Sequence, residues 1–171
     1  MRRVLLLLLF NLIGLGHAQF LPKDITGNDV KQCEDKGFIV INRYDLNKTD
    51  RYGNIIWSKN TKNTENFRNV GSDNSLQITS DGGYISAGHI YKKVYYGGSW
   101  KKTPHNCLIK TDLDGNIVWQ KEYAMGSARS VQITNDGGFI VAGSIQKYPG
   151  TYELPAVTNC YLFKTDRNGN L

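Results

Sequence analysis

The sequence predicts an all-β protein built from four-stranded antiparallel blades of a β-propeller. The first observation is an internal repeat: Ser75–Gly88 (SLQITSDGGYISAG) returns about 55 residues later as Ser130–Gly143 (SVQITNDGGFIVAG). The second is that each copy leads to another shared phrase, Leu108–Asn116 (LIKTDLDGN) and then Leu162–Asn170 (LFKTDRNGN). Each unit therefore holds two hairpins, and strands such as 84–90 carry apolar or small residues on both faces. One such sheet alone would be unstable, and its radial repetition is the propeller.

The repeated phrases assign the individual strands and turns. Leu76 and Ile78 alternate with polar residues, as in a strand, and Asp81-Gly82-Gly83 has the composition of a tight hairpin turn. Residues 84–90 form the returning strand, and residues 91–106 are predicted to be a long loop. Residues 108–111 and 117–123 are the third and fourth strands, joined by a second turn. A two-sheet sandwich made from the same strands is the alternative, but the regular spacing favours the propeller.

These phrases divide residues 19–171 into four segments. Residues 19–36, which lack periodicity, are predicted to be a lead-in segment, and residues 37–60 a partial first blade consisting of one hairpin. Residues 61–123 form the second blade with its preceding loop, and residues 124–171 form the third, with an inter-blade loop at 124–129. The third blade is expected to be truncated before its fourth strand. The propeller would then be incomplete, with fewer than three full blades, and other blades or another chain would be needed to close the ring.

Residues 1–18 have the layout of a secretory signal peptide. Arg2 and Arg3 precede an apolar run at residues 4–15, and Gly16-His17-Ala18 is a small-x-small cleavage site. The run is short for a membrane anchor, so no membrane span is expected after signal removal. The sequence therefore predicts a secreted or cell-surface protein.

Charge and cysteine content exclude two classes of protein. Signal removal takes two arginines from a formal charge of +6, and the remaining basicity is too weak and scattered to predict nucleic-acid binding. The three cysteines, Cys33, Cys107 and Cys160, are too few for a disulfide framework. A Cys107–Cys160 pair is disfavoured, because a one-residue difference between the two phrases would turn the sulfurs to opposite faces.

The phrases S-x-Q-x-T-x-D-G-G-[YF]-I-x-A-G and K-T-D-x-x-G-N-I-x-W resemble the quinoprotein-like (PQQ-like) propeller repeats of secreted bacterial proteins. Such repeats are common in Bacteroidetes, often ahead of a C-terminal secretion-sorting domain. The resemblance covers roughly residues 37–171. It implies that Trp57 and Trp119 pack between neighbouring blades. It implies no cofactor here, because no residue matches the quinone-binding groups of the family's dehydrogenases.

No catalytic or metal site is predicted from residue spacing. His89 lies in a predicted strand and is expected to be a satisfied structural residue, and His105 lies in a predicted loop without a partner at ligand spacing. Asp112, Asp114 and Asn116 suggest an EF-hand, but Gly115 follows Asp114 directly, so the register is wrong and a hairpin turn is preferred.

One segment suggests a binding site, because it combines aromatic rings with cations in a predicted long loop. Such residues suit sugars, acidic polymers or protein partners. The candidate ligand-binding residues are Tyr91, Lys92, Lys93, Tyr95, Tyr96, Trp100, Lys101 and Lys102. The alternative is a solvated connecting loop.

The sequence as a whole favours an exported, non-enzymatic propeller module that binds a polysaccharide or surface-protein ligand. Two alternatives remain open. One is part of a propeller hydrolase or quinone-dependent oxidoreductase whose active site lies in other blades. The other is a structural spacer ahead of a sorting domain.

Overall fold

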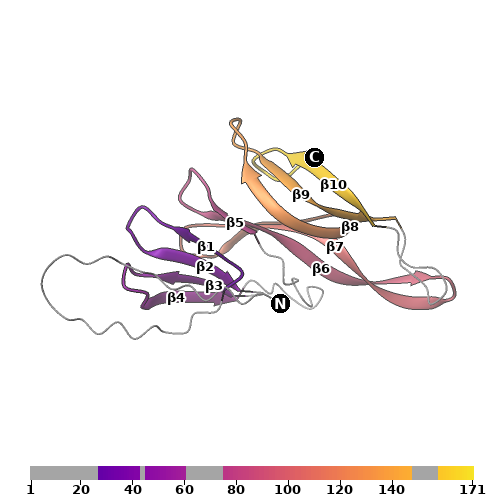
Figure 1. The fold of residues 1–171 in the computed structure, drawn as a ribbon, viewed down its shortest axis with the longest axis horizontal. Helices are drawn as coiled ribbons and strands as arrows, with labels where there is room; N and C mark the ends of the chain where they lie inside the picture. Colours follow the sequence, from indigo (N-terminus) through magenta and orange to yellow (C-terminus); the bar gives the residue numbers. More distant parts are fainter. Residues whose placement is uncertain (1–26, 43–44, 61–74, 148–157) are drawn as a thin grey trace, which may run out of the picture.

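The computed structural model describes residues 27–42, 45–60, 75–147 and 158–171, which form two antiparallel β-sheets (Figure 1). The predicted signal peptide, residues 61–74 of the predicted second blade and residues 148–157 of the predicted third blade lie outside this part of the chain. The first sheet has the order β1-β2-β3-β4, and the second has the order β10-β9-β8-β7-β6-β5. The strands are β1 (Asp29–Gln32), β2 (Phe38–Asn42), β3 (Asp45–Thr49), β4 (Ile55–Asn60), β5 (Ser75–Ile78), β6 (Tyr84–Tyr96), β7 (Ser99–Thr111), β8 (Ile117–Ile133), β9 (Phe139–Gln146) and β10 (Thr158–Thr165).

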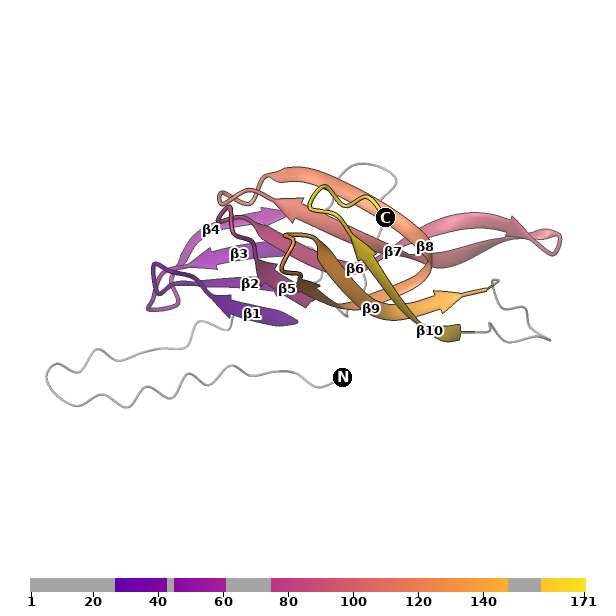
Figure 2. The same cartoon turned by 90° about the horizontal axis from the view of Figure 1, so that it is seen from above.

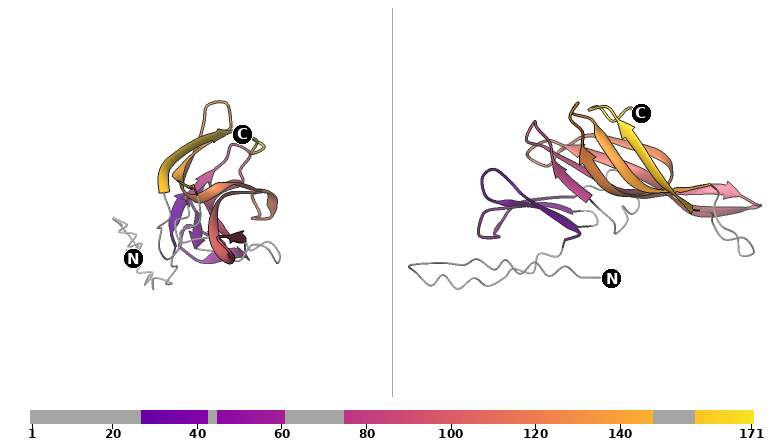
Figure 3. Two further views of the ribbon diagram at one scale, coloured as in Figure 1. Left: turned by 90° about the vertical axis from the view of Figure 1, so that its right-hand side faces the viewer. Right: turned by 45° about the horizontal axis from the view of Figure 1, so that its top comes forward.

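The all-β prediction is confirmed, and the second sheet curls strongly along its length (Figure 3). The described part of the chain contains no helix long and apolar enough to cross a membrane.

The first unit has more strands than the predicted hairpin. Part of the expected lead-in segment forms β1, which pairs with β2, and the predicted partial blade at 37–60 contains β2, β3 and β4. The turn between β1 and β2 is Asp35-Lys36-Gly37, in which Lys36 adopts a φ of 66°. Gly82 and Gly137 stand at this position in the later units with φ of 80° and 77°. The β1–β2 hairpin of this unit was missed because a lysine occupies the left-handed position where the turn pattern calls for glycine.

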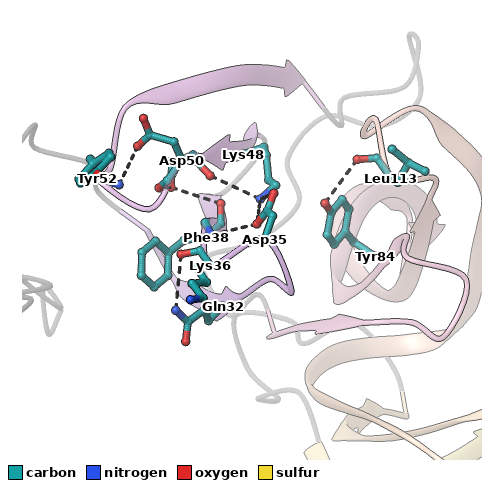
Figure 4. Close-up of polar contacts among 11 residues, drawn as sticks. Gln32, Asp35, Lys36, Phe38, Lys48, Asp50, Tyr52, Tyr84 and Leu113 are labelled. Carbon is teal, nitrogen blue, oxygen red and sulfur yellow. Dashed lines mark hydrogen bonds and ion pairs between the residues drawn. The ribbon is translucent and has the colours of Figure 1, made fainter.

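The aspartate and lysine of these turns form a pair that recurs in every unit. Lys48 Nζ lies 2.7 Å from Asp35 Oδ2, and Lys110 Nζ lies 2.9 Å from Asp81 Oδ2. Lys164 pairs with Asp136 in the same way. Each pair ties the first turn of its unit to the strand that enters the second turn (Figure 4 shows the first).

The predicted loop at 124–129 is the middle of the continuous strand β8. Its first half pairs with β7 and its second half with β9, and a bulge lies between Ala128 and Ser130. No Asn, Asp or Pro interrupts residues 124–129, and the backbones approach so closely that a Cβ on Gly126 would lie 2.0 Å from the Ser144 carbonyl oxygen. The strand therefore bends without ending, and this bend curls the sheet.

The predicted long loop at 91–106 is also paired. β6 and β7 stay in register out to Tyr96 and Ser99, and Gly97 and Gly98 close the hairpin with φ of 58° and 78°. Positive φ at both central positions is the pattern of a type I′ turn, which suits the twist of a two-strand ribbon. We call residues 91–104 the arm, and it projects beyond the other strands of the second sheet (Figure 2).

Among the described residues, two of the three clusters of buried side chains lie on opposite faces of β6, because β6 sends alternate residues in opposite directions. Tyr84 points to the first cluster and Ile85 to the second. The first cluster lies between the first sheet and β5–β6 and contains Ile39, Ile41, Leu46, Leu76 and Tyr84. The second lies against β8–β10 and contains Ile85, Ala87, Leu108, Ala128, Val131, Phe139, Val141 and Phe163. Both faces of the central β5–β7 layer are thus covered.

A tryptophan lies at the same place in each of the two contacts between successive units, and we call these contacts the joints. A Cβ on Gly115 would lie 2.7 Å from the Trp57 ring, and a Cβ on Gly169 would lie 2.9 Å from the Trp119 ring. Lys59 Nζ lies 3.2 Å from Asn116 Oδ1, and Lys121 likewise contacts Asn170. The outer strand of one unit thus seats its tryptophan on the Gly-Asn turn of the next.

Candidate functional site

All eight candidate ligand-binding residues lie on the arm, and strand pairing divides them between its two faces. Side chains alternate along a strand, and directly paired residues share a face. Tyr95 pairs with Trp100, and Lys93 pairs with Lys102. One face, which we call the aromatic face, therefore carries Tyr91, Lys93, Tyr95, Trp100 and Lys102. The opposite face carries Lys92, Tyr96 and Lys101.

The aromatic face presents two large rings to solvent. Tyr95 is 61% exposed and Trp100 is 68% exposed. Their ring centroids are 5.4 Å apart with an interplanar angle of 67°, an edge-to-face arrangement. This cross-strand pair orders the two rings relative to each other and leaves ring surface open.

Positive charge lies beside the rings. Lys93 and Lys102 are direct cross-strand partners, and like charges placed opposite each other destabilise a strand pair. The Lys102 ammonium lies 4.5 Å from the centroid of the Tyr91 ring, within cation–π range. The aromatic face is thus both apolar and cationic.

The opposite face is fastened to β8 through Glu122. Its carboxylate lies 2.5 Å from Lys92 Nζ and 3.0 Å from His105 Nδ1. The predicted loop position of His105 was therefore wrong, since His105 lies in β7, and Glu122 is an acidic partner that does not stand at ligand spacing in the sequence. The partner was missed because it comes from β8, and only the register of the β7–β8 ladder brings it into range.

The Glu122 contacts have the order of a hydrolase triad, because His105 Nε2 lies 3.2 Å from Thr103 Oγ1. However, Thr103 is only 1% exposed, and its hydroxyl also approaches the Lys92 carbonyl oxygen at 3.4 Å. A nucleophile must reach substrate, and this hydroxyl is closed off by its own hairpin. The chain of contacts therefore holds the base of the arm.

A second buried polar group lies where β8 bends. His89 Nδ1 lies 2.6 Å from Ser127 Oγ, and both residues are buried. The Asn106 amide donates to the carbonyl oxygens of Ala124 and Ser144 at 2.9 and 3.2 Å. These bonds link β6 and β7 to the bent strand and to β9, which is a structural role.

The Asp-rich turns use their oxygens locally. Asp112 Oδ1 accepts the backbone N–H groups of Asp114 and Asn116 at 3.0 and 2.8 Å, and Asp112 Oδ2 accepts the Asn116 side-chain amide. Hydrogen bonds from Asn116 lower the pKa of the Asp112 carboxyl. No group of three or more metal-binding side chains occurs in the described ranges.

The three cysteines are free thiols in different environments. Cys107 is buried between β6 and β8, and burial raises the pKa of its thiol to about 12. Cys33 is half-buried, and burial also raises its pKa. Cys160 is exposed on β10.

Comparisons with known proteins assign no family to this arrangement. The sequence matches no protein-family model, and it matches no curated protein.

Proposed function

We propose that this chain is an exported, non-enzymatic β-propeller module that binds a polysaccharide or surface-protein ligand through the aromatic face of the arm. The observation that carries the proposal is the exposed Tyr95–Trp100 pair. Exposed aromatic rings in fixed orientation are typical of binding surfaces, because ring faces stack on sugar rings and on apolar side chains. The tip of the arm contributes no residue to the buried clusters, so its rings are not needed for core packing.

The propeller assignment is supported by the equivalence of the units. The first strand of each unit lies beside the first strand of the next. Leu76 N donates to Asp29 Oδ2 at 2.8 Å, and Val131 N donates to Ser75 Oγ at 3.2 Å. The repeated tryptophan joints at the outer strands add to this, because successive units contact one another at both inner and outer edges. Face-to-face stacking of consecutive sheets about their first strands is the packing of propeller blades.

The comparison of the three units also suggests what covers the outer face of β9 and β10. Its residues Ile140, Ala142 and Leu162 stand at positions whose counterparts in the first and second units are buried by the next unit. Leu162 is 64% exposed, whereas Leu46 and Leu108 are at most 2% exposed. We propose that a further sheet of the same repeat packs on this face. We call this surface the open face (Ile140, Ala142 and Leu162).

The binding proposal is tested on glycan and anionic-polymer arrays with the native chain and three single variants. Tyr95→Ala and Trp100→Ala remove rings from the aromatic face and are expected to weaken binding. Tyr96→Ala removes a ring of similar size from the opposite face of the same hairpin and is the matched control. Binding that survives both aromatic-face variants would refute the assignment of the site, and the absence of any ligand would favour the spacer alternative.

A further inference from the structure

We infer that the ligand of the aromatic face is an anionic polysaccharide, a chain of sugars bearing carboxylate or sulfate groups. This inference rests on the proposed function and adds the chemical class of the ligand. The inference requires charge as well as ring surface, so it can be refuted while the proposed binding function stands.

The first argument is the uncompensated charge of the aromatic face. Lys93 and Lys102 lie directly opposite each other, so their ammonium groups repel. Within the part of the chain that the structure describes, neither ammonium pairs with a carboxylate, whereas Lys92 on the opposite face is neutralised by Glu122. An anion bound between Lys93 and Lys102 would replace repulsion by two attractive contacts, so the face favours negatively charged ligands.

The second argument is the spacing of rings and cations. The Tyr95–Trp100 pair lies two residues along the ladder from the Lys93–Lys102 pair. Two residues of a strand span roughly 7 Å, so one sugar chain that lies along the arm can reach both pairs. A sugar stacked on the exposed rings would therefore place an acidic group of the same or the next sugar near the two lysines.

The third argument concerns the scale of the charge. Nucleic-acid grooves and membrane-bound basic segments use larger groups of cations that follow a phosphate backbone or a lipid surface. The aromatic face has two lysines beside one ring pair, which fits a ligand with about one charge per sugar. Single-stranded nucleic acid, which also stacks on aromatic rings, is the competing ligand that the experiment must distinguish.

The test uses the native chain with matched probes. Polygalacturonate is compared with its methyl-esterified form, and dextran sulfate with dextran, so that each pair differs only in charge. Oligo-dT and vesicles of anionic phospholipid are measured in parallel. We expect the acidic member of at least one polysaccharide pair to bind about tenfold more tightly than its neutral counterpart, with affinity that falls as salt is raised.

Variants then assign the effect to residues. The double variant Lys93→Gln/Lys102→Gln is expected to weaken binding of the acidic polymer about tenfold and to flatten its salt dependence. Lys101→Gln removes one charge from the opposite face and is expected to leave both unchanged. Thermal unfolding of each variant confirms that the fold is retained.

The outcomes separate the two proposals. If Tyr95→Ala and Trp100→Ala abolish binding but the lysine double variant does not, the binding site stands and the anionic ligand is refuted. If all of these variants bind as the native chain does, both proposals fail. Tighter binding of oligo-dT or of the vesicles than of every acidic polysaccharide would overturn the inference in favour of that ligand.

Discussion

At the scale of single residues, the contact between Trp57 and the Gly115 turn offers a controlled measure of joint packing. Gly115 and Gly98 both have a φ of 78°, but only Gly115 faces a neighbour, since a Cβ on Gly98 would meet nothing within 4 Å. Alanine at either position should cost about 1–2 kcal/mol for the left-handed backbone. Gly115→Ala should cost about 1–3 kcal/mol more, because its methyl group would displace the Trp57 ring.

Denaturant unfolding of Gly115→Ala and Gly98→Ala measures this difference directly. Equal destabilisation by the two variants would mean that the Trp57 ring moves aside without cost. The joint would then contribute little to holding the two sheets together.

Cysteine reactivity should follow the three environments. Cys160 is exposed and should react with a thiol reagent in the native protein at neutral pH, whereas Cys107 should stay unmodified because it is buried and its thiol pKa is raised to about 12. Cys33 should react at an intermediate rate. Mass spectrometry of peptides after brief alkylation, with and without denaturant, measures the order, and rapid native labelling of Cys107 would contradict the described packing of β6–β8.

At the scale of strands and turns, the repeated Asp–Lys pairs should govern stability in acid. Partial burial alone would raise the pKa of Asp81, but hydrogen bonds from Thr79 and Lys110 outweigh it and lower the pKa to about 2. An unfolded aspartate titrates near 4, so the unfolded chain binds the proton first. The stabilisation is complete above about pH 4 and is lost as pH falls toward 2.

Asp81→Asn should therefore lower stability at pH 7 and weaken its dependence on pH between 4 and 2. Asp114→Asn makes the same change in an exposed turn outside the pairing and serves as the control. The midpoint of urea unfolding at pH 7, 4 and 2.5 measures the effect. Parallel pH profiles for Asp81→Asn and the native chain would show that the Asp81–Lys110 pair does not contribute.

The sequence predicted the strands that carry repeated phrases, because their turns have a fixed chemistry. Asp81-Gly82-Gly83 and its copy each close a hairpin as expected. The first unit was incompletely predicted because Lys36 replaces the turn glycine, and the arm was missed as a hairpin although Gly97-Gly98 is a type I′ signal. The continuation of β8 through residues 124–129 depends on tertiary pairing with β9, which no local pattern reports.

The candidate site was predicted as a set of residues and not as a surface. Composition alone drew attention to the aromatic and basic residues of the arm. Their division between the aromatic face and the opposite face follows from the β6–β7 register. The contacts of Glu122 with Lys92 and His105 depend on the position of β8 as well. The direction of a side chain in a two-strand ribbon follows from the strand register. The repeated phrases do not include the arm, so they did not predict its register.

At the scale of the whole molecule, the two joints and the open face indicate that all units pack in the same way. Each unit buries one face against the unit before it and presents the other to the unit after it, as β5–β7 does between the two clusters. Burying a leucine contributes roughly 1.5–3 kcal/mol, and the open face leaves Leu162 largely in solvent. An exposed apolar sheet face of this kind favours association.

We therefore expect residues 19–171, expressed alone, to self-associate through the open face or to fold poorly because this face is exposed. Leu162→Ser should reduce the association measured by light scattering and the binding of an apolar fluorescent dye. Leu113→Ser is the matched control, because Leu113 is similarly exposed at 58% but lies in a turn away from this face. A native chain that is monomeric, binds no dye and unfolds in one sharp, reversible transition would contradict the proposal. The open face would then be stable in water without the further sheet that the first two joints lead us to expect.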